Sequence, residues 1–151
     1  MESYPPVIPY LVVPDAAAAI DFYKAALGAL EIVRHHAPES TKITHAHLVI
    51  NDGSVMLSDD FSETMGGKPS TPQALGGSPV TIHLQMTDVD RFWERAVEHG
   101  AIVTMPLADQ FWGDRYGQFK DPFGHKWSVG HTKISLSEDQ LKEAARVWFK
   151  I

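Results

Sequence analysis

The chain contains no cysteine, so it can form no disulfide, no thiolate metal site and no cysteine nucleophile. It also lacks any apolar run near the roughly 20 residues that a membrane helix needs. Residues 1–6 contain neither a basic region nor an apolar segment, so we expect no signal peptide. These absences favour a cytoplasmic protein without a membrane partner, because a reducing compartment needs no disulfides.

The chain also has fewer positively charged than negatively charged residues. The chain has 13 Lys and Arg residues against 19 Asp and Glu residues, which gives a net charge of −6. This balance argues against nucleic acid or an anionic membrane surface as a partner. The hydrophobic fraction of 44% and the charged fraction of 21% are typical of a globular protein. A length of 151 residues suffices for one core or for two small fused modules.

Two segments of the chain follow the same plan, which predicts a duplicated structural unit. Each has a strand, then a helix that starts at an aspartate and ends at a glycine, then three short strands. The capping residues are Asp15 and Gly28 in the first segment, and Asp88 and Gly100 in the second. The predicted elements span residues 7–13, 16–27, 29–35, 43–50 and 54–59, and residues 80–86, 89–99, 101–107, 115–120 and 125–129. The pattern predicts one α+β domain over residues 1–151, made of modules 5–61 and 79–131.

The modules are joined by residues 62–78, which are rich in Gly, Pro, Ser and Thr. A loop of this length is either a flexible linker or a functional lid. After the second module, Ser137 is a natural start for a last helix at residues 137–150. Its apolar residues Leu141, Ala145 and Trp148 share one face, which predicts packing on the sheet or on a second subunit.

Residues 119–129 read as a strand, a tight turn and a second strand, with Asp121-Pro-Phe-Gly124 suited to a type I turn. This hairpin lies within WGDRYGQFKDPFGHKWSVG, and the first module contains PYLVVPDAAAAIDFYKAALGA. Together they resemble the PhnB-like branch of the glyoxalase/bleomycin-resistance/extradiol-dioxygenase group, the vicinal oxygen chelate superfamily. The resemblance covers residues 7–131. It implies two paired βαβββ modules, each an open, curved mixed sheet, with a cleft between them, and usually a homodimer.

The same resemblance implies four symmetric positions where metal enzymes of the superfamily place their ligands, on the first and last strand of each module. In this chain they are occupied by Ile8, Leu57, Thr81 and Ser128. Leu and Ile cannot bind a metal, and Ser and Thr hydroxyls are poor ligands for the divalent ions concerned. We therefore expect no metal and no other cofactor.

The alternative is a metal site whose ligands have moved. His45 and His47 lie two residues apart on a predicted strand, so their side chains share a face. With His83 and Asp59 they could form a cluster suited to zinc or iron. Equally, each histidine could be a polar residue on a half-exposed strand or a hydrogen-bonding group of the cleft.

Without a metal, the cleft becomes an amphiphilic pocket. Tyr10, Leu57, Thr81, His83, Lys126 and Ser128 share strand parity with the implied metal positions. Phe111 and Trp112 precede the last hairpin and could form a stacking wall for a ligand, or a structural cap for the sheet. Arg115 could bind an anionic group or form a salt bridge with Asp109 or Asp114. The predicted ligand-binding residues are Tyr10, His47, Leu57, Thr81, His83, Phe111, Trp112, Arg115, Lys126 and Ser128.

The sequence contains no phosphate-binding glycine loop in a strand-turn-helix setting and no nucleophile elbow. The leading hypothesis is a metal-free protein that binds a small organic ligand in the cleft of a homodimer, as the bleomycin-resistance proteins do. The alternative is a metal-dependent lyase or dioxygenase of the same superfamily with relocated His and Asp ligands. A third option is an accessory protein whose cleft is vestigial. The sequence assigns no catalytic residue and leaves open whether clefts form within or between chains.

Overall fold

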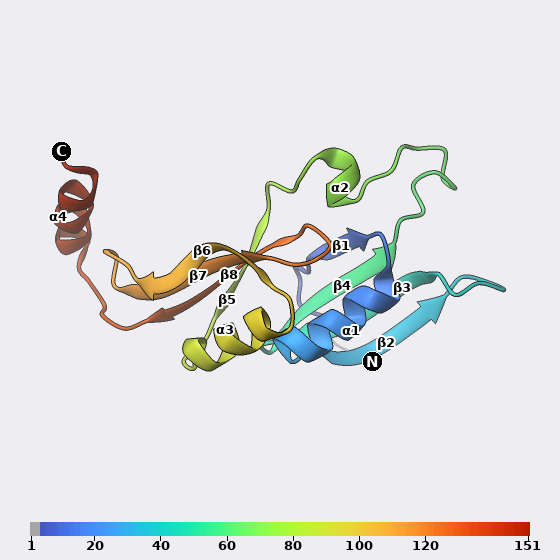
Figure 1. Cartoon of the computed structure of the whole chain (residues 1–151), viewed down its shortest axis with the longest axis horizontal. Helices are drawn as coiled ribbons and strands as arrows, with labels where there is room; N and C mark the ends of the chain where they lie inside the picture. The colour runs from blue at the N-terminus through green and yellow to red at the C-terminus, as the bar shows by residue number, and fades with distance from the viewer. Residues whose placement is uncertain (1–3) are drawn as a thin grey trace.

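The computed structural model describes residues 4–151 and contains two four-stranded sheets, each with a long helix packed on it (Figure 1). The first module contains β1 (Tyr10–Val13), α1 (Ala16–Leu27), β2 (Leu30–His36), β3 (Ile43–Ile50) and β4 (Gly53–Asp59). The second contains β5 (Thr81–Gln85), α3 (Val89–Glu98), β6 (Ile102–Asp109), β7 (Asp114–Lys120) and β8 (Lys126–Thr132). A short helix α2 (Pro72–Leu75) lies between them, and α4 (Glu138–Phe149) follows the second module.

The two sheets have the same topology. Their strand orders are β1-β4-β3-β2 and β5-β8-β7-β6. The first and last strands of each module pair in parallel, and the other neighbours pair antiparallel. The predicted α+β fold of two βαβββ units with mixed sheets is therefore confirmed.

Local chemistry explains most element boundaries. The Asp15 side chain accepts a hydrogen bond from the Ala18 N–H at 3.0 Å, and Gly28 ends α1 in the left-handed conformation with φ of 65°. Asp88 precedes α3 without a side-chain capping bond, unlike the predicted N-cap. The sequence did not predict α2, although Thr71 caps it and Pro72 lies in its first turn.

Asp121 joins the two modules through a buried carboxylate. The residue is fully buried, and Oδ2 accepts hydrogen bonds from the Tyr23 hydroxyl at 2.6 Å and from Trp127 Nε1 at 2.9 Å. Oδ1 accepts from the backbone N–H groups of Phe123 and His125 at 2.9 and 3.0 Å. Burial, followed by the charge and hydrogen bond of Asp121, raises the pKa of the Tyr23 phenol well above its usual value. Because Tyr23 belongs to α1, the predicted turn also fixes one module against the other.

A second connection runs between the two long helices. Arg95 of α3 donates hydrogen bonds to the carbonyl oxygens of Ala25 at 2.7 Å and Lys24 at 3.0 Å. These carbonyls lie in the last turn of α1, where backbone acceptors lack intrahelical partners and a cation is favourable. The arrangement holds α1 and α3 side by side (Figure 1).

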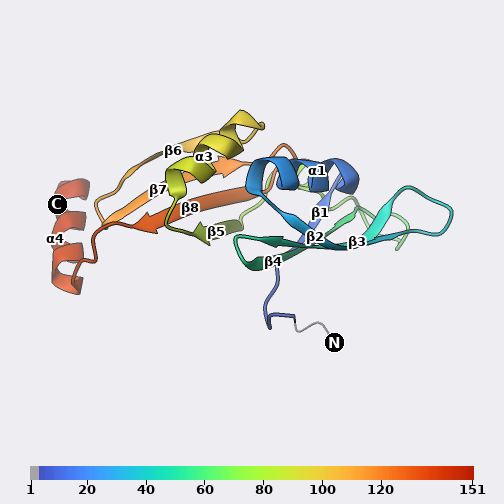
Figure 2. The ribbon, with the colours of Figure 1, turned by 90° about the horizontal axis from the view of Figure 1, so that it is seen from below.

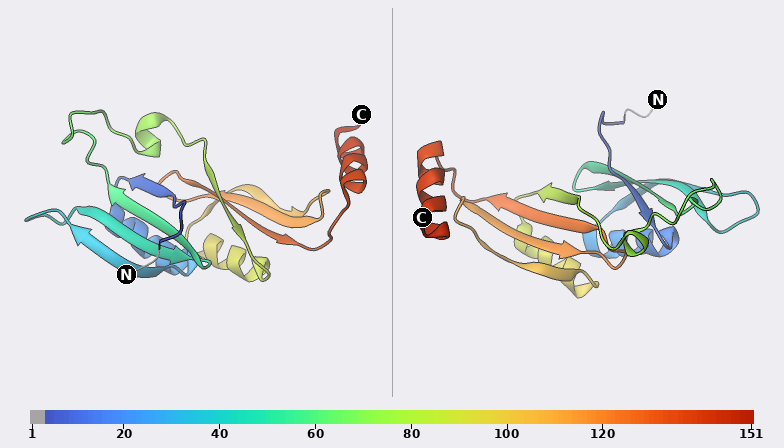
Figure 3. Two further views of the ribbon diagram at one scale, coloured as in Figure 1. Left: turned by 180° about the vertical axis from the view of Figure 1, so that it is seen from behind. Right: turned by 90° about the horizontal axis from the view of Figure 1, so that it is seen from above.

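Both long helices lie on the same side of the two sheets (Figure 2). Each sheet therefore has one face packed on a helix and one face free of helices, which we call its open face. The open faces of the two modules lie next to one another and point to the same side of the molecule (Figure 3). Within one chain, neither open face covers the other.

The C-terminal helix is present as predicted, with Ser137 and Gln140 forming a reciprocal capping box. The predicted packing on the sheet is not found, because no residue of α4 is buried and the helix stands beyond the end of the second module (Figures 1 and 3). Its ring contacts with the body are those of Trp148 and Phe149 with Phe111, at centroid distances of 5.5 and 6.4 Å. Among the described residues, no helix has the length and apolar character needed to cross a membrane.

Candidate functional site

The open face of the second module carries four of the ten predicted ligand-binding residues, Thr81, His83, Lys126 and Ser128. Strand pairing places His83 of β5 beside Ser128 of β8, and Ser128 beside Gln118 of β7. The neighbouring residues Trp127 and Val129 point to the helix side, where they are fully buried in the core. The polar and aromatic residues of this open face include Thr81, His83, Gln85, Tyr116, Gln118, Lys126, Ser128 and Thr132.

His83 is held at both ring nitrogens. Nδ1 lies 2.8 Å from the Ser128 hydroxyl oxygen, and Nε2 lies 2.8 Å from the amide oxygen of Gln85. The Gln85 amide nitrogen in turn donates to the Thr132 hydroxyl at 3.1 Å. The imidazole also stacks on Tyr116, with ring centroids 5.8 Å apart and planes at 21°. This exposed imidazole therefore has a fixed orientation.

Gly130 leaves space for this arrangement. A Cβ atom at that position would lie 3.0 Å from His83 Cε1 and 3.2 Å from the Gln85 amide oxygen. Either contact would force a neighbouring side chain to move. The absence of a side chain on this strand therefore accommodates the hydrogen-bonded pair of His83 and Gln85.

The open face of the first module carries histidines and a tyrosine. The Tyr10 hydroxyl lies 3.1 Å from His45 Nδ1, and the His45 ring stacks on His35 at a centroid distance of 6.1 Å. Burial, and then the charges of His35 and His47, lower the pKa of His45. The His45 side chain therefore favours its neutral form, which can donate and accept hydrogen bonds.

His47 is the buried member of this group. The residue is 6% exposed, its Nε2 lies 2.9 Å from the Ser54 hydroxyl, and its ring contacts Tyr4 at a centroid distance of 5.1 Å. Among the described residues, Nδ1 has no hydrogen-bond partner. A buried polar atom without a partner is unfavourable, so this arrangement of His47 costs stability.

Two of the predicted residues meet where the modules adjoin. Tyr10 of β1 and Lys126 of β8 both line a hollow of about 280 Å³ between the modules. The other lining residues are Pro9, Leu11, Ser78, Val80, Ile82 and His125. His125 also contributes to the contact between modules, because its Nε2 lies 2.9 Å from the Val12 carbonyl oxygen.

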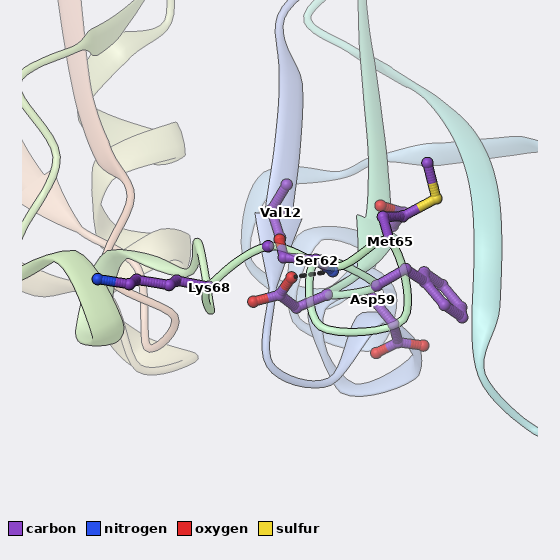
Figure 4. A pocket seen from close by; sticks show the side chains of 9 residues that line it. Val12, Asp59, Ser62, Met65 and Lys68 are labelled. Carbon is purple, nitrogen blue, oxygen red and sulfur yellow. Dashed lines mark hydrogen bonds between the residues drawn. The ribbon is translucent and has the colours of Figure 1, made fainter.

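A second hollow, of about 450 Å³, lies between the ends of β1 and β4 and the loop that follows β4 (Figure 4). Asp60 organises this loop by accepting hydrogen bonds from the backbone N–H groups of Ser62 and Ser70, at 2.9 and 2.8 Å. A side-chain hydrogen bond with Ser62, followed by the backbone hydrogen bonds from Ser70 and Ser62, lowers the pKa of Asp60 to about 2. Figure 4 shows the side chain of Lys68 pointing away from Asp59. Asp60 therefore has a clear structural role.

Leu57 and Arg115 lie on the helix side of their sheets rather than in the predicted cleft. Leu57 is fully buried in the core, because its strand places Met56 and Ser58, not Leu57, on the open face. Arg115 Nη2 pairs with Asp90 of α3 at 2.7 Å, and Nη1 pairs with Asp109 at 3.2 Å. The predicted ligand-binding roles of these two residues are therefore not supported, and one of the predicted salt bridges of Arg115 is found.

Phe111 and Trp112 extend the second open face toward α4. Trp112 packs edge-on against Tyr116 at 5.5 Å and against Phe111 at 5.1 Å, and its Nε1 donates to Asp114 at 3.1 Å. With the contact between Phe111 and Trp148, a continuous series of rings runs from His83 to α4. Both loop aromatics are half-buried, so they form a wall at the end of the open face.

Strand register changes one of the four implied metal positions. Tyr10 and His83 each lie five residues before the aspartate that precedes their helix, and they pair with Met56 and Ser128 respectively. Met56, rather than Leu57, is therefore the counterpart of Ser128. The four positions are then Ile8, Met56, Thr81 and Ser128, and they still offer no carboxylate, imidazole or thiolate.

The relocated set of His45, His47, His83 and Asp59 is not assembled in the structure. Asp59 points to the helix side, where it accepts hydrogen bonds from the backbone N–H groups of Ala16 at 2.8 Å and Ile43 at 2.6 Å. His83 belongs to the other module. Across residues 4–151, no three His, Asp or Glu side chains are grouped so as to hold a metal ion.

Sequence reasoning missed Gln85, Tyr116, Gly130 and Thr132. The same period of two that selected His83 and Ser128 would have placed Gln85 and Gly130 on the open face. Tyr116 lies opposite Gly130 in the register, which the sequence alone does not give. The partners of His83 therefore become visible only when the strands are aligned.

Comparisons with known proteins agree with this architecture. Residues 7–129 match the model of the glyoxalase/bleomycin resistance protein/dioxygenase superfamily. The uncharacterized protein Rv0887c of Mycobacterium tuberculosis is 51% identical over 140 residues, which cover 93% of this chain and 82% of that protein.

Two solved structures share the fold. TioX from Micromonospora sp. ML1 has a TM-score of 0.63 and 26% identity, covering 87% of this chain and 98% of TioX. A PhnB protein from Bacillus cereus has a TM-score of 0.62 and 15% identity, covering 84% of this chain and 99% of that protein, and shows the fold alone. With two βαβββ units in the order typical of this fold and a family match over residues 7–129, the chain belongs to the glyoxalase/bleomycin resistance protein/dioxygenase superfamily.

Proposed function

We propose that this protein binds a small organic ligand without a metal, in clefts that form when two copies of the chain associate. The observation that carries the proposal is that both helices lie on one side of the sheets and leave both open faces uncovered (Figure 2). By strand register, these faces present hydrogen-bonding and aromatic side chains. A sheet with one uncovered face needs another layer to enclose a site. In a two-fold dimer, the first open face of one copy would cover the second open face of the other.

The side chains of the two faces suit a planar, partly polar ligand. Tyr10 is 49% exposed, His83 is exposed, and Trp112 and Tyr116 supply further ring surface. Aromatic walls with a few placed polar groups are the usual composition of small-molecule sites. Binding or sequestration requires no catalytic group, which fits a site whose one exposed, oriented imidazole is hydrogen-bonded within the protein. We place this function in the cytoplasm because a chain without cysteine suits a reducing compartment.

We expect the protein to be a dimer at micromolar concentration in light scattering and native mass spectrometry. A stable interface buries at least about 1,000 Å² in total, and the two open faces offer the surface for it. Native mass spectrometry of freshly purified protein would also report any bound molecule. A monomer in both measurements would contradict the proposed assembly.

Mixing two variants distinguishes clefts between copies from clefts within one chain. Tyr10→Ala alters the first open face and His83→Ala the second, so each variant alone should bind the fluorescent probe 8-anilinonaphthalene-1-sulfonate weakly. If clefts form between copies, refolding an equal mixture should leave about a quarter of the clefts with neither substitution. Probe binding of the wild-type affinity should then reappear in that fraction. No recovery in a mixture that forms dimers would place each cleft within one chain.

We also expect the purified protein to contain far less than one equivalent of zinc, nickel, iron or manganese per chain. The reason is the chemistry of Ile8, Met56, Thr81 and Ser128, which supply no strong ligand for these ions. Elemental analysis measures this directly, with His47→Ala and His83→Ala as comparisons. About one equivalent that is lost in either variant would instead favour the relocated metal site and a metal-dependent lyase or dioxygenase.

A further inference from the structure

The hydrogen bonds around His83 define which ring nitrogen carries the proton. The Gln85 amide nitrogen donates to Thr132, so the Gln85 amide oxygen faces His83 Nε2. An amide oxygen only accepts hydrogen bonds, and therefore Nε2 carries a hydrogen. In the neutral imidazole Nδ1 is then an acceptor, and the Ser128 hydroxyl donates to it.

The two partners of His83 differ in accessibility. Ser128 is 2% exposed and lies in a central strand of the sheet, so its bond to Nδ1 is enclosed by protein. Gln85 is exposed and lies on the edge strand β5. A ligand that approaches the open face can therefore displace Gln85 without disturbing Ser128. The group that this exchange makes available is the Nε2–H donor.

We propose that His83 donates a hydrogen bond from Nε2 to a carbonyl oxygen of the ligand, and that the Gln85 amide oxygen occupies the position of that oxygen in the free protein. This inference rests on the proposed function and names the chemical class of its ligand: a planar molecule with an uncharged carbonyl acceptor, such as a ketone or an amide. Ser128 is a positioning residue, because its enclosed hydrogen bond to Nδ1 holds the imidazole from beneath.

The surroundings of His83 favour a planar molecule at this point. Tyr116 covers one side of the imidazole, with ring planes at 21°. Gly130 keeps the strand below free of a side chain next to His83 Cε1 and the Gln85 oxygen. A flat carbonyl compound can therefore approach Nε2 in the imidazole plane, which is the geometry that a hydrogen bond requires.

The first test observes the tautomer in the protein labelled with ¹⁵N-histidine. At pH 8, His83 should show a protonated Nε2 and an unprotonated Nδ1 in long-range ¹H–¹⁵N spectra. The signal missing from His83→Asn assigns the residue. Gln85→Ala should lose the strict preference for this tautomer, because the Ser128 hydroxyl can either donate to Nδ1 or accept from it. A wild-type His83 with its proton on Nδ1 would overturn the proposal.

The second test uses two bicyclic probes, 1-indanone and indane, which differ by one carbonyl oxygen. The Nε2 signal of His83 should shift on titration with 1-indanone. In the wild type the new hydrogen bond replaces that of Gln85, so the affinities of the two probes should differ little there. In Gln85→Ala, 1-indanone should bind about three- to tenfold more tightly than indane, the factor expected for one neutral hydrogen bond. No shift with 1-indanone, or equal affinity of the two probes in Gln85→Ala, would overturn the proposal.

Gln85→Ala supplies the sharper comparison. Without the competing amide oxygen, 1-indanone should bind about three- to tenfold more tightly than to the wild type. Gln73→Ala, on the exposed helix α2, is the matched control and should change nothing. Unchanged or weaker binding in Gln85→Ala would show that Gln85 does not occupy the ligand's place. Dimer formation and bound molecules in native mass spectrometry test the proposed function separately, so the two can fail independently.

Discussion

Replacing Asp121 with alanine should lower the free energy of unfolding by about 3–5 kcal/mol, the range for removing one partner of a buried charged network. The carboxylate is fully buried and accepts four hydrogen bonds, two from side chains and two from the backbone. The substitution leaves the Tyr23 hydroxyl and the Trp127 indole N–H buried without their acceptor. Urea denaturation with a two-state fit measures the effect.

Asp15→Ala is the matched control. It makes the same chemical change at an aspartate that caps α1 through one exposed hydrogen bond, so we expect a loss of about 1 kcal/mol. Asp121→Asn should also be destabilising. The NH2 group of the asparagine amide would face two hydrogen-bond donors, from which it cannot accept. If Asp121→Ala were no more destabilising than Asp15→Ala, the buried carboxylate would not be what holds the modules together.

This network explains why the hairpin at residues 119–129 is so recognisable in the sequence. Asp121 is at once the first residue of the turn and the acceptor for Tyr23 of the other module. The turn chemistry is local and can be predicted from sequence. The role of Asp121 between modules depends on a contact across 98 residues, which no local pattern shows.

The elements could be predicted because their signals are local. Apolar periodicity, Asp15 and Gly28 define α1, and the duplicated plan gives the same order of elements along the chain in both modules. The structure differs from the prediction mainly where a tertiary contact determines the boundary of an element, or where an element is very short. The first strand begins at Tyr10 rather than at residue 7, and α2 has only four residues.

The candidate site was predictable only up to strand register. A shift of one residue reverses the face of a strand residue, which is why Leu57 was assigned to the cleft although it packs in the core. Arg115 lies on β7, adjacent to Tyr116, and therefore points to the opposite face. The bond of His83 to Ser128 joins two strands, and the two residues are 45 positions apart, so only the folded sheet reveals it. Gln85 lies two residues from His83 on the same strand.

Gly113→Ala should detach the segment that carries α4 from the second module. Gly113 has φ of 98°, a conformation that side chains disfavour, and a Cβ atom there would overlap the carbonyl oxygen of Ile134. The Gly113 carbonyl oxygen accepts hydrogen bonds from the backbone N–H groups of Lys133 and Ile134, at 3.1 and 3.0 Å. To relieve the overlap, residues 133–136 must move away, and these two hydrogen bonds are lost.

Hydrogen exchange measures this release. The amides of Lys133 and Ile134 should exchange at least about tenfold faster in Gly113→Ala, because each loses a hydrogen bond that contributes about 1 kcal/mol or more to stability. The free energy of global unfolding should fall by about 1–3 kcal/mol. Gly66→Ala is the matched control, because Gly66 has φ of 81° but nothing within 4 Å of an added Cβ. If the two variants exchanged at the same rates at Lys133 and Ile134, backbone strain alone would account for the change. A selective effect in Gly113→Ala would show that this one contact positions α4 and, through Phe111 and Trp112, the end wall of the second open face.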